Sequence, residues 1–65
     1  MKVYVFQSRI KFITFIEKSL TKMSGAKYEL TDSGDLYCTA NSEYLGNIWN
    51  DSTICLDNAE IVCLN

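Results

Sequence analysis

The sequence predicts a small α+β domain with the element order β-α-β-β-α-β and a last short strand. The chain has 65 residues, 48% of them hydrophobic, which is typical of a small globular fold with one thin core. Short runs rich in Val, Ile, Tyr and Phe alternate with polar turn residues, and one segment has its apolar residues at helical spacing. Because the chain has no proline and only three glycines, we expect one continuous domain over residues 1–65.

The first two predicted elements are a strand over Lys2 to Gln7 and a helix over Ser8 to Ser24. Val, Tyr and Phe favour the strand, and polar residues bound it. The second segment also contains Ile, Phe and Thr, so its periodicity decides between helix and strand. At about 100° per residue, the lysines lie on one side, and the opposite arc holds the apolar residues Phe12, Ile13, Ile16, Leu20 and Met23. As a strand, the segment would have no polar face. Ser8 is expected to cap the helix and Gly25 to follow its end.

A hairpin is predicted next. Its strands are Lys27 to Thr31 and Leu36 to Ala40, and they flank the sequence Asp-Ser-Gly-Asp. The glycine of this sequence supplies the positive φ that a short hairpin loop needs. The two strands are therefore expected to form an antiparallel pair.

A second, shorter helix is predicted after the hairpin, with Asn41 and Ser42 as its cap. Its apolar side would consist of Tyr44, Leu45, Ile48 and Trp49, over about two turns. Gly46 in its middle costs about 1 kcal/mol relative to alanine. The chain then ends in two strands, Thr53 to Leu56 and Glu60 to Leu64, around a tight Asp-Asn turn.

This element order resembles the split βαβ sandwich, in which helices pack on one face of an antiparallel or mixed sheet. The resemblance covers nearly the whole chain, but it is one of architecture and has no diagnostic motif behind it. It implies that the second face of the sheet is open to water, to a second copy or to a partner. RNA-recognition domains share the strand order, but their aromatic sheet motif has no match here.

The residue types disfavour catalysis, metal binding and cofactors. The chain has no histidine, which is the usual base near neutral pH and the commonest metal ligand. Cys38, Cys55 and Cys63 lack the close pairing of zinc sites, and we interpret them as small buried residues on strands. Asp32 and Asp35 lie in a predicted turn, where aspartates commonly serve local hydrogen bonds. We therefore expect no enzyme activity, no metal and no cofactor.

The chain is expected to be cytoplasmic and not bound to a membrane. It has no signal-peptide core near its first residue, and no apolar stretch approaches the roughly 18 residues needed to span a bilayer. An odd number of widely spaced cysteines does not form a disulfide framework and fits a reduced compartment.

Charge is distributed unevenly. Residues 1–27 contain all six basic groups and one acid, a net charge of +5, whereas residues 28–65 contain seven acids and no base, a net charge of −7. Such asymmetry indicates interaction surfaces. The alternative is that the two halves fold together and neutralise each other.

Aromatic residues suggest where a partner would bind. If Val3 and Val5 face the helices, Tyr4 and Phe6 lie on the other side of the sheet, and Tyr37 joins them by alternation. Trp49 is a second anchor, unless it closes the core. Exposed aromatics rimmed by carboxylates resemble a protein-binding surface. The predicted protein-binding residues are Tyr4, Phe6, Tyr37, Trp49, Asp32 and Asp35.

The leading expectation is therefore a protein-binding module, an inhibitor or adaptor that covers a surface of a larger protein. The acidic half would steer it to a basic partner, such as a protein that processes nucleic acids. In size, acidic bias and lack of catalytic groups, the chain is similar to small phage-encoded proteins that neutralise host-defence or toxin enzymes, a likeness that transfers no residues. A homodimer with paired aromatic faces is a further alternative.

The alternative from another class is a small regulator that binds nucleic acid. Its residues would be Lys11, Phe15, Lys18 and Lys22, because ammonium groups release phosphate counterions and an aromatic ring stacks on bases. The acidic total opposes this hypothesis, and a solvated helix face would explain the lysines equally well.

Overall fold

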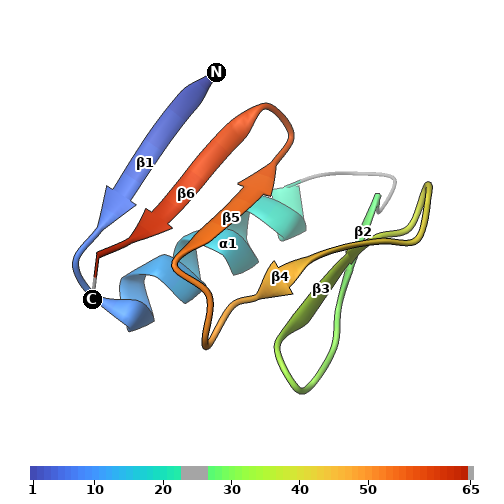
Figure 1. The fold of residues 1–65 in the computed structure, drawn as a ribbon, viewed down its shortest axis with the longest axis horizontal. Helices are drawn as coiled ribbons and strands as arrows, with labels where there is room; N and C mark the ends of the chain where they lie inside the picture. The colour runs from blue at the N-terminus through green and yellow to red at the C-terminus, as the bar shows by residue number, and fades with distance from the viewer. Residues whose placement is uncertain (23–26, 65) are drawn as a thin grey trace.

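The computed structural model describes residues 1–22 and 27–64, which form one helix and six strands (Figure 1). The α+β class is therefore confirmed. In chain order the elements are β1 (Lys2–Phe6), α1 (Arg9–Lys22), β2 (Tyr28–Leu30), β3 (Asp35–Cys38), β4 (Glu43–Asn47), β5 (Thr53–Leu56) and β6 (Ala59–Cys63). The predicted end of the first helix at Ser24 and Gly25 lies outside the described residues.

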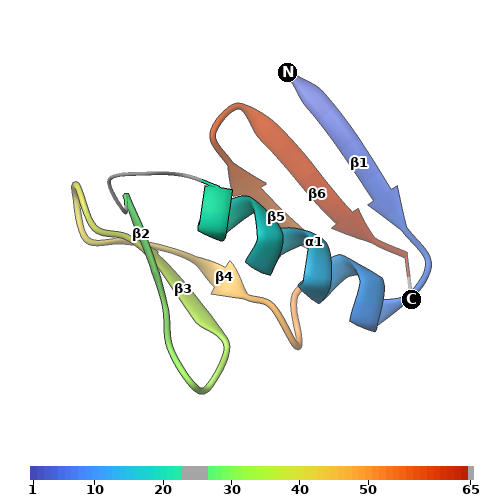
Figure 2. The ribbon, with the colours of Figure 1, turned by 180° about the vertical axis from the view of Figure 1, so that it is seen from behind.

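The strands form two three-stranded sheets. The first has the order β1-β6-β5, with β1 parallel and β5 antiparallel to β6. The second is an antiparallel meander in the order β2-β3-β4. Helix α1 lies against one face of the first sheet, and β4 leads into β5 where the two sheets meet (Figures 1 and 2).

One hydrophobic core joins the helix to both sheets. Phe12 and Ile16, four residues apart on α1, are fully buried, as their helical spacing predicts. The strands contribute alternating residues, which gives β5 and β6 one inward face each. The other buried side chains are Leu36, Ile48, Ile54, Leu56, Ile61 and Cys63. Within the described part of the chain, no helix combines the length and apolarity needed to cross a bilayer.

The start of α1 is fixed by two residues. Ser8 caps it, as predicted: its carbonyl oxygen accepts a hydrogen bond from the Phe12 N–H at 3.0 Å, and its hydroxyl accepts one from the Lys11 N–H at 3.4 Å. Arg9 Nη1 donates to the carbonyl oxygens of Ile48 at 2.9 Å and Asp51 at 2.7 Å. Arg9 thereby ties the helix to the turn after β4, a contact that sequence reasoning missed.

The predicted second helix is wrong, because the same residues form β4 and a turn. Gly46 has a φ of 136° and Ser42 a φ of 60°, and neither value occurs in a right-handed helix. The Asn47 side-chain oxygen accepts hydrogen bonds from the N–H groups of Trp49 at 2.9 Å and Asn50 at 3.1 Å. These local bonds give the backbone an alternative to a helix. The split βαβ arrangement is therefore not observed.

The predicted hairpins are confirmed. In the β2–β3 loop, Gly34 has a φ of 90°, and its N–H donates to the Thr31 carbonyl oxygen at 3.0 Å. Between β5 and β6, Asp57 and Asn58 both have positive φ, which matches the right-handed twist of a two-residue hairpin.

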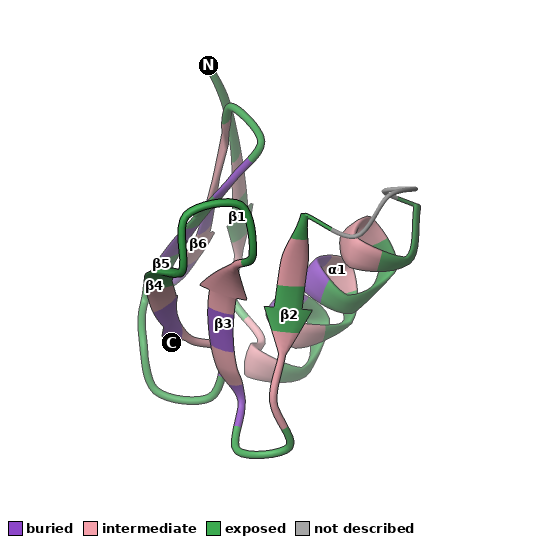
Figure 3. Cartoon of the chain, turned by 90° about the vertical axis from the view of Figure 1, so that its right-hand side faces the viewer, coloured by how far each residue is buried: buried purple, intermediate pink, exposed green. Residues whose placement is uncertain are grey.

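Burial along the strands follows the pleat of the sheet. Residues of β5 alternate between exposed and buried, and β3 shows a buried band between half-buried ones (Figure 3).

Candidate functional site

The aromatic residues of β1 pack inward, against the helix. The ring of Phe15 lies 4.8 Å from that of Tyr4 and 5.1 Å from that of Phe6, measured between centroids. Val3 and Val5 lie on the opposite face and are 56% and 55% exposed. The prediction that these valines face the helix is wrong, since the larger aromatic rings bury more apolar area there. Tyr4 and Phe6 therefore do not belong to an open aromatic sheet face.

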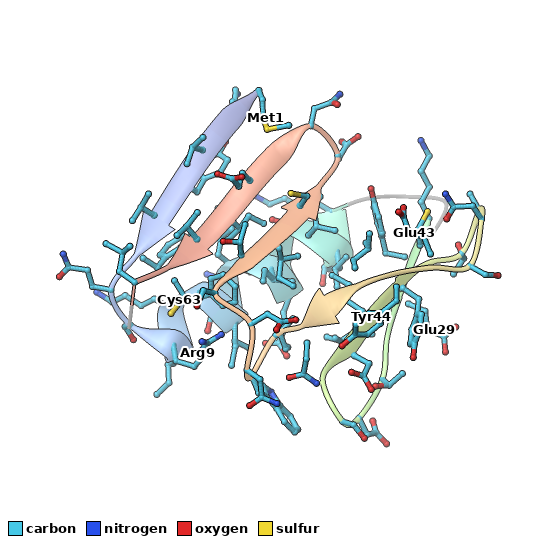
Figure 4. All side chains as sticks on the ribbon, viewed as in Figure 1. Met1, Arg9, Glu29, Glu43, Tyr44 and Cys63 are labelled. Carbon is cyan, nitrogen blue, oxygen red and sulfur yellow. The ribbon has the colours of Figure 1, made fainter. Side chains whose placement is uncertain are left out.

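Tyr37, which is half-buried, and the exposed Tyr44 instead lie on the β2-β3-β4 sheet. Tyr37 is paired in register with Glu29 on one side and Tyr44 on the other. The two tyrosine rings lie 5.3 Å apart at an angle of 57°, and Tyr44 is 51% exposed. Since Leu36 is buried beneath the sheet, Tyr37 lies on the outer face, as its alternation predicts. Figure 4 labels Glu29 and Tyr44 on this sheet.

Asp35 fixes the geometry of this outer face. Its Oδ1 accepts hydrogen bonds from the Tyr44 hydroxyl and from Asn47 Nδ2, both at 3.1 Å. Asp51 Oδ2 accepts the Asn47 backbone N–H at 2.7 Å, which holds the end of β4. We call the surface formed by Glu29, Asp35, Tyr37 and Tyr44 the tyrosine face.

Trp49 lies beyond the end of the tyrosine face and is 52% exposed. Its ring covers Gly34: a Cβ at that position would lie 3.1 Å from Trp49 Cδ2. Trp49 therefore packs on the β2–β3 loop, and the alternative in which it closes the core is wrong. Asp32 is exposed in the same loop.

Sequence reasoning missed Tyr44, because it assigned this residue to the apolar side of the absent second helix. The available signal was Gly46, which is unfavourable in a helix. Of the predicted protein-binding residues, the structure brings Asp35 and Tyr37 together and places Trp49 and Asp32 nearby through the loop of Gly34. It separates Tyr4 and Phe6 from them.

The two charged halves do not neutralise each other by direct contact. Within residues 1–22 and 27–64, no ion pair joins a basic side chain to a carboxylate. The Arg9 guanidinium donates hydrogen bonds to the backbone carbonyl oxygens of Ile48 and Asp51. Its Cζ atom lies 5.0 Å from the ring centroid of Phe12. Among the described residues, the carboxylates of the tyrosine face and the lysines of α1 therefore have no charged partner.

A second surface gathers the lysines of α1. Phe6, Lys11, Thr14, Phe15 and Lys18 line a shallow hollow of about 280 Å³ beside β1. Lys22 lines the next hollow along the helix, which shares Thr14 and Lys18 with the first. The structure thus brings together the four residues that the nucleic-acid hypothesis named. We call Lys11, Phe15, Lys18 and Lys22 the lysine row.

The cysteines differ in exposure. Cys63 is buried as expected, Cys38 is half-buried and Cys55 is exposed. Cys38 and Cys55 line a hollow of about 310 Å³ where the two sheets meet. No group of three side chains suited to holding a metal ion occurs among the residues that the structure describes.

The sequence matches no family model, and neither a curated protein nor a solved structure is significantly similar to the chain. The two surfaces are therefore interpreted from their own chemistry.

Tyr44 is expected to titrate above its ordinary pKa of 10.0. Partial desolvation raises the pKa most, followed by the hydrogen bond to Asp35 and the negative charges of Asp35 and Asp51. Since the folded pKa lies above the unfolded one, protonated Tyr44 stabilises the fold below pH 10, and this contribution is lost as the pH rises through the folded pKa.

Tyrosinate absorbance tests this expectation. The difference between the titrations of the parent chain and Tyr44→Phe gives the Tyr44 midpoint. Asp35→Asn should lower that midpoint while leaving it above the ordinary value, because desolvation remains. An unchanged midpoint in Asp35→Asn would contradict the role assigned to the carboxylate.

Proposed function

We propose that the chain is a protein-binding module that blocks a basic surface of a larger protein with its tyrosine face and Trp49. The observation that carries the proposal is the exposure of Tyr44 and Trp49, each about half open to solvent. Tyr44 also donates to Asp35, a carboxylate with no cationic partner among residues 1–22 and 27–64. Tyrosine and tryptophan are the residues that most often anchor protein interfaces.

The tyrosine face is held in place before a partner arrives. Asp35 accepts two hydrogen bonds, and Tyr37 packs against Tyr44, so little side-chain freedom remains to be lost on binding. Because less entropy is lost on binding, a pre-organised face binds its partner more tightly than a mobile face of the same area.

The chemistry of the face favours lysine or arginine side chains in the partner. Beside Tyr37, a shallow hollow of about 330 Å³ is lined by Glu29, Cys38, Thr39 and Ser42. A cation entering it would meet the carboxylate of Glu29 and the tyrosine ring together. The carboxylates would also accelerate association with a basic surface and suppress acidic partners.

The chain is large enough to block a surface of another protein. A standard interface buries about 800 Å² on each partner. Against a total accessible surface of 4407 Å², that is about a fifth of the molecule. The patch would therefore extend from Glu29 across Tyr44 to Trp49, and an inhibitor or adaptor of the phage type needs no more than this.

Affinity capture from an extract of the producing organism tests the proposal. Tyr44→Ala and Trp49→Ala should each weaken retention of a stoichiometric partner by roughly tenfold or more, the loss typical of an anchor residue. Val3→Thr, a change at an exposed position of the other sheet, is the matched control and should retain the partner. Circular dichroism should show all three variants folded.

Two outcomes would contradict the proposal. In the first, the partner is retained equally by Tyr44→Ala and Val3→Thr, which would place the interface elsewhere. In the second, sedimentation shows a homodimer that Tyr44→Ala dissociates and capture yields no other protein, which would make the tyrosine face a contact between copies of this chain.

A further inference from the structure

We propose that the lysine row and the adjoining hollow bind single-stranded nucleic acid, with a base stacked on Phe15 and phosphates on the lysines. This surface is distinct from the tyrosine face, and the inference goes beyond the proposed function. It rests on three features: the spacing of the row, the support beneath Phe15 and the local charge.

The lysine row is straight. Its members follow one another at intervals of four, three and four residues, which places them on one side of the helix. From Lys11 to Lys22 the helix rises about 16 Å, at roughly 1.5 Å per residue. A duplex strand rises roughly 3.4 Å along its axis per nucleotide, and an extended single strand rises more, so the row is long enough to contact more than one phosphate.

Phe15 is supported from below. Tyr4 and Phe6 of β1 contact its ring at centroid distances of 4.8 Å and 5.1 Å. The part of Phe15 that remains accessible lines the hollow together with Phe6 and is flanked by Lys11 and Lys18. In this arrangement a base can stack on the aromatic ring while its neighbouring phosphates contact the lysines on either side.

The local charge favours an anion even though the chain is acidic overall. No carboxylate lines the hollow, and no described carboxylate pairs with Lys11 or Lys18. The tyrosine face lies on the other sheet of a molecule 30 Å long, and exposed charges are largely screened beyond about 10 Å at 0.1 M salt. Glu17, the one acid of α1, lines the neighbouring hollow together with Lys18 and Lys22, so two lysines face one carboxylate there.

The geometry favours a single strand over a duplex. A base inside a duplex is stacked on both faces, so it cannot present a face to Phe15. The lysines alone would bind a duplex or another polyanion through phosphates, whereas the phenylalanine adds affinity only for an unstacked base.

Fluorescence anisotropy with labelled oligothymidylate and oligouridylate, in a salt series that starts at about 0.1 M, tests the proposal. The double variant Lys11→Gln/Lys18→Gln should bind at least tenfold more weakly and reduce the slope of log affinity against log salt by about 1.4, for two lost phosphate contacts. Lys27→Gln removes an exposed lysine outside the row and should bind like the parent chain. Phe15→Leu should weaken single-strand binding about tenfold, as loss of one stacked base does.

Three results would overturn the proposal: no binding by the parent chain, equal loss in Lys27→Gln and Lys11→Gln/Lys18→Gln, or a duplex or inorganic polyphosphate that competes as well as the single strand. Because the glutamine substitutions are at exposed positions, they test the site even if Phe15→Leu loosens the packing around β1. They should also leave partner capture by the tyrosine face unchanged, so the two proposals fail independently.

Discussion

Replacing Phe12 with alanine is expected to lower the free energy of unfolding by about 3–5 kcal/mol. Phe12 is fully buried in the core between α1 and the strands, and the Arg9 guanidinium lies over its ring. Truncating such a phenylalanine costs about 3–5 kcal/mol. A chain of this length has a free energy of unfolding of roughly 3–10 kcal/mol, at about 0.05–0.15 kcal/mol per residue, so the substitution removes much or all of it.

Urea unfolding followed by circular dichroism measures this cost. Ile10→Ala is the matched control, because Ile10 lies on the same helix and is 75% exposed. Its free energy of unfolding should change by less than about 1 kcal/mol. Similar midpoints for Phe12→Ala and Ile10→Ala would show that α1 does not pack as described.

Replacing Gly46 with alanine is the second large effect, and it should lower the free energy of unfolding by about 2–4 kcal/mol. An added Cβ would lie 2.6 Å from Ile54 Cδ1 and 2.8 Å from Asp51 Oδ2. Ile54 is fully buried and Asp51 holds the Asn47 N–H, so neither moves without loss. The φ of 136° adds strain for any residue with a side chain.

The control for Gly46→Ala is the reverse exchange at Ser42, which also has a positive φ, of 60°, but is exposed. Ser42→Gly should change the free energy of unfolding by less than about 1 kcal/mol. Thermal or urea unfolding compares the two variants. If Gly46→Ala is as stable as Ser42→Gly, the close packing of β4 on β5 is not present in solution.

Gly46 also explains why part of the fold could not be predicted. The helix α1 and the two hairpins were predictable because their signals are local: an apolar arc opposite lysines, and turn residues between short strands. The apolar residues Tyr44, Leu45, Ile48 and Trp49 have the spacing of a helix face. The close packing that requires a glycine at position 46 comes from Ile54 and Asp51, which lie further along the chain. Periodicity alone does not report such tertiary contacts.

The candidate site was predictable to a similar extent. Alternation correctly divided β1 into two sets, but both sets are apolar, so the sequence does not say which one faces the helix. The packing of Phe15 decides it. The lysine row follows from helical spacing alone, whereas the tyrosine face requires the register of β3 against β4, including its irregularity between Leu36 and Tyr37.

The parallel pairing of β1 with β6 constrains the order in which this chain acquires its structure. β1 pairs with β6, more than 50 residues further along the chain, and β6 is the central strand of its sheet (Figure 1). During synthesis, the apolar sides of β1 and α1 therefore stay exposed until residues 59–63 have been made and β6 can pack against them. Closure of this sheet is a long-range event, so it is expected to be slower than formation of the local β2-β3-β4 meander.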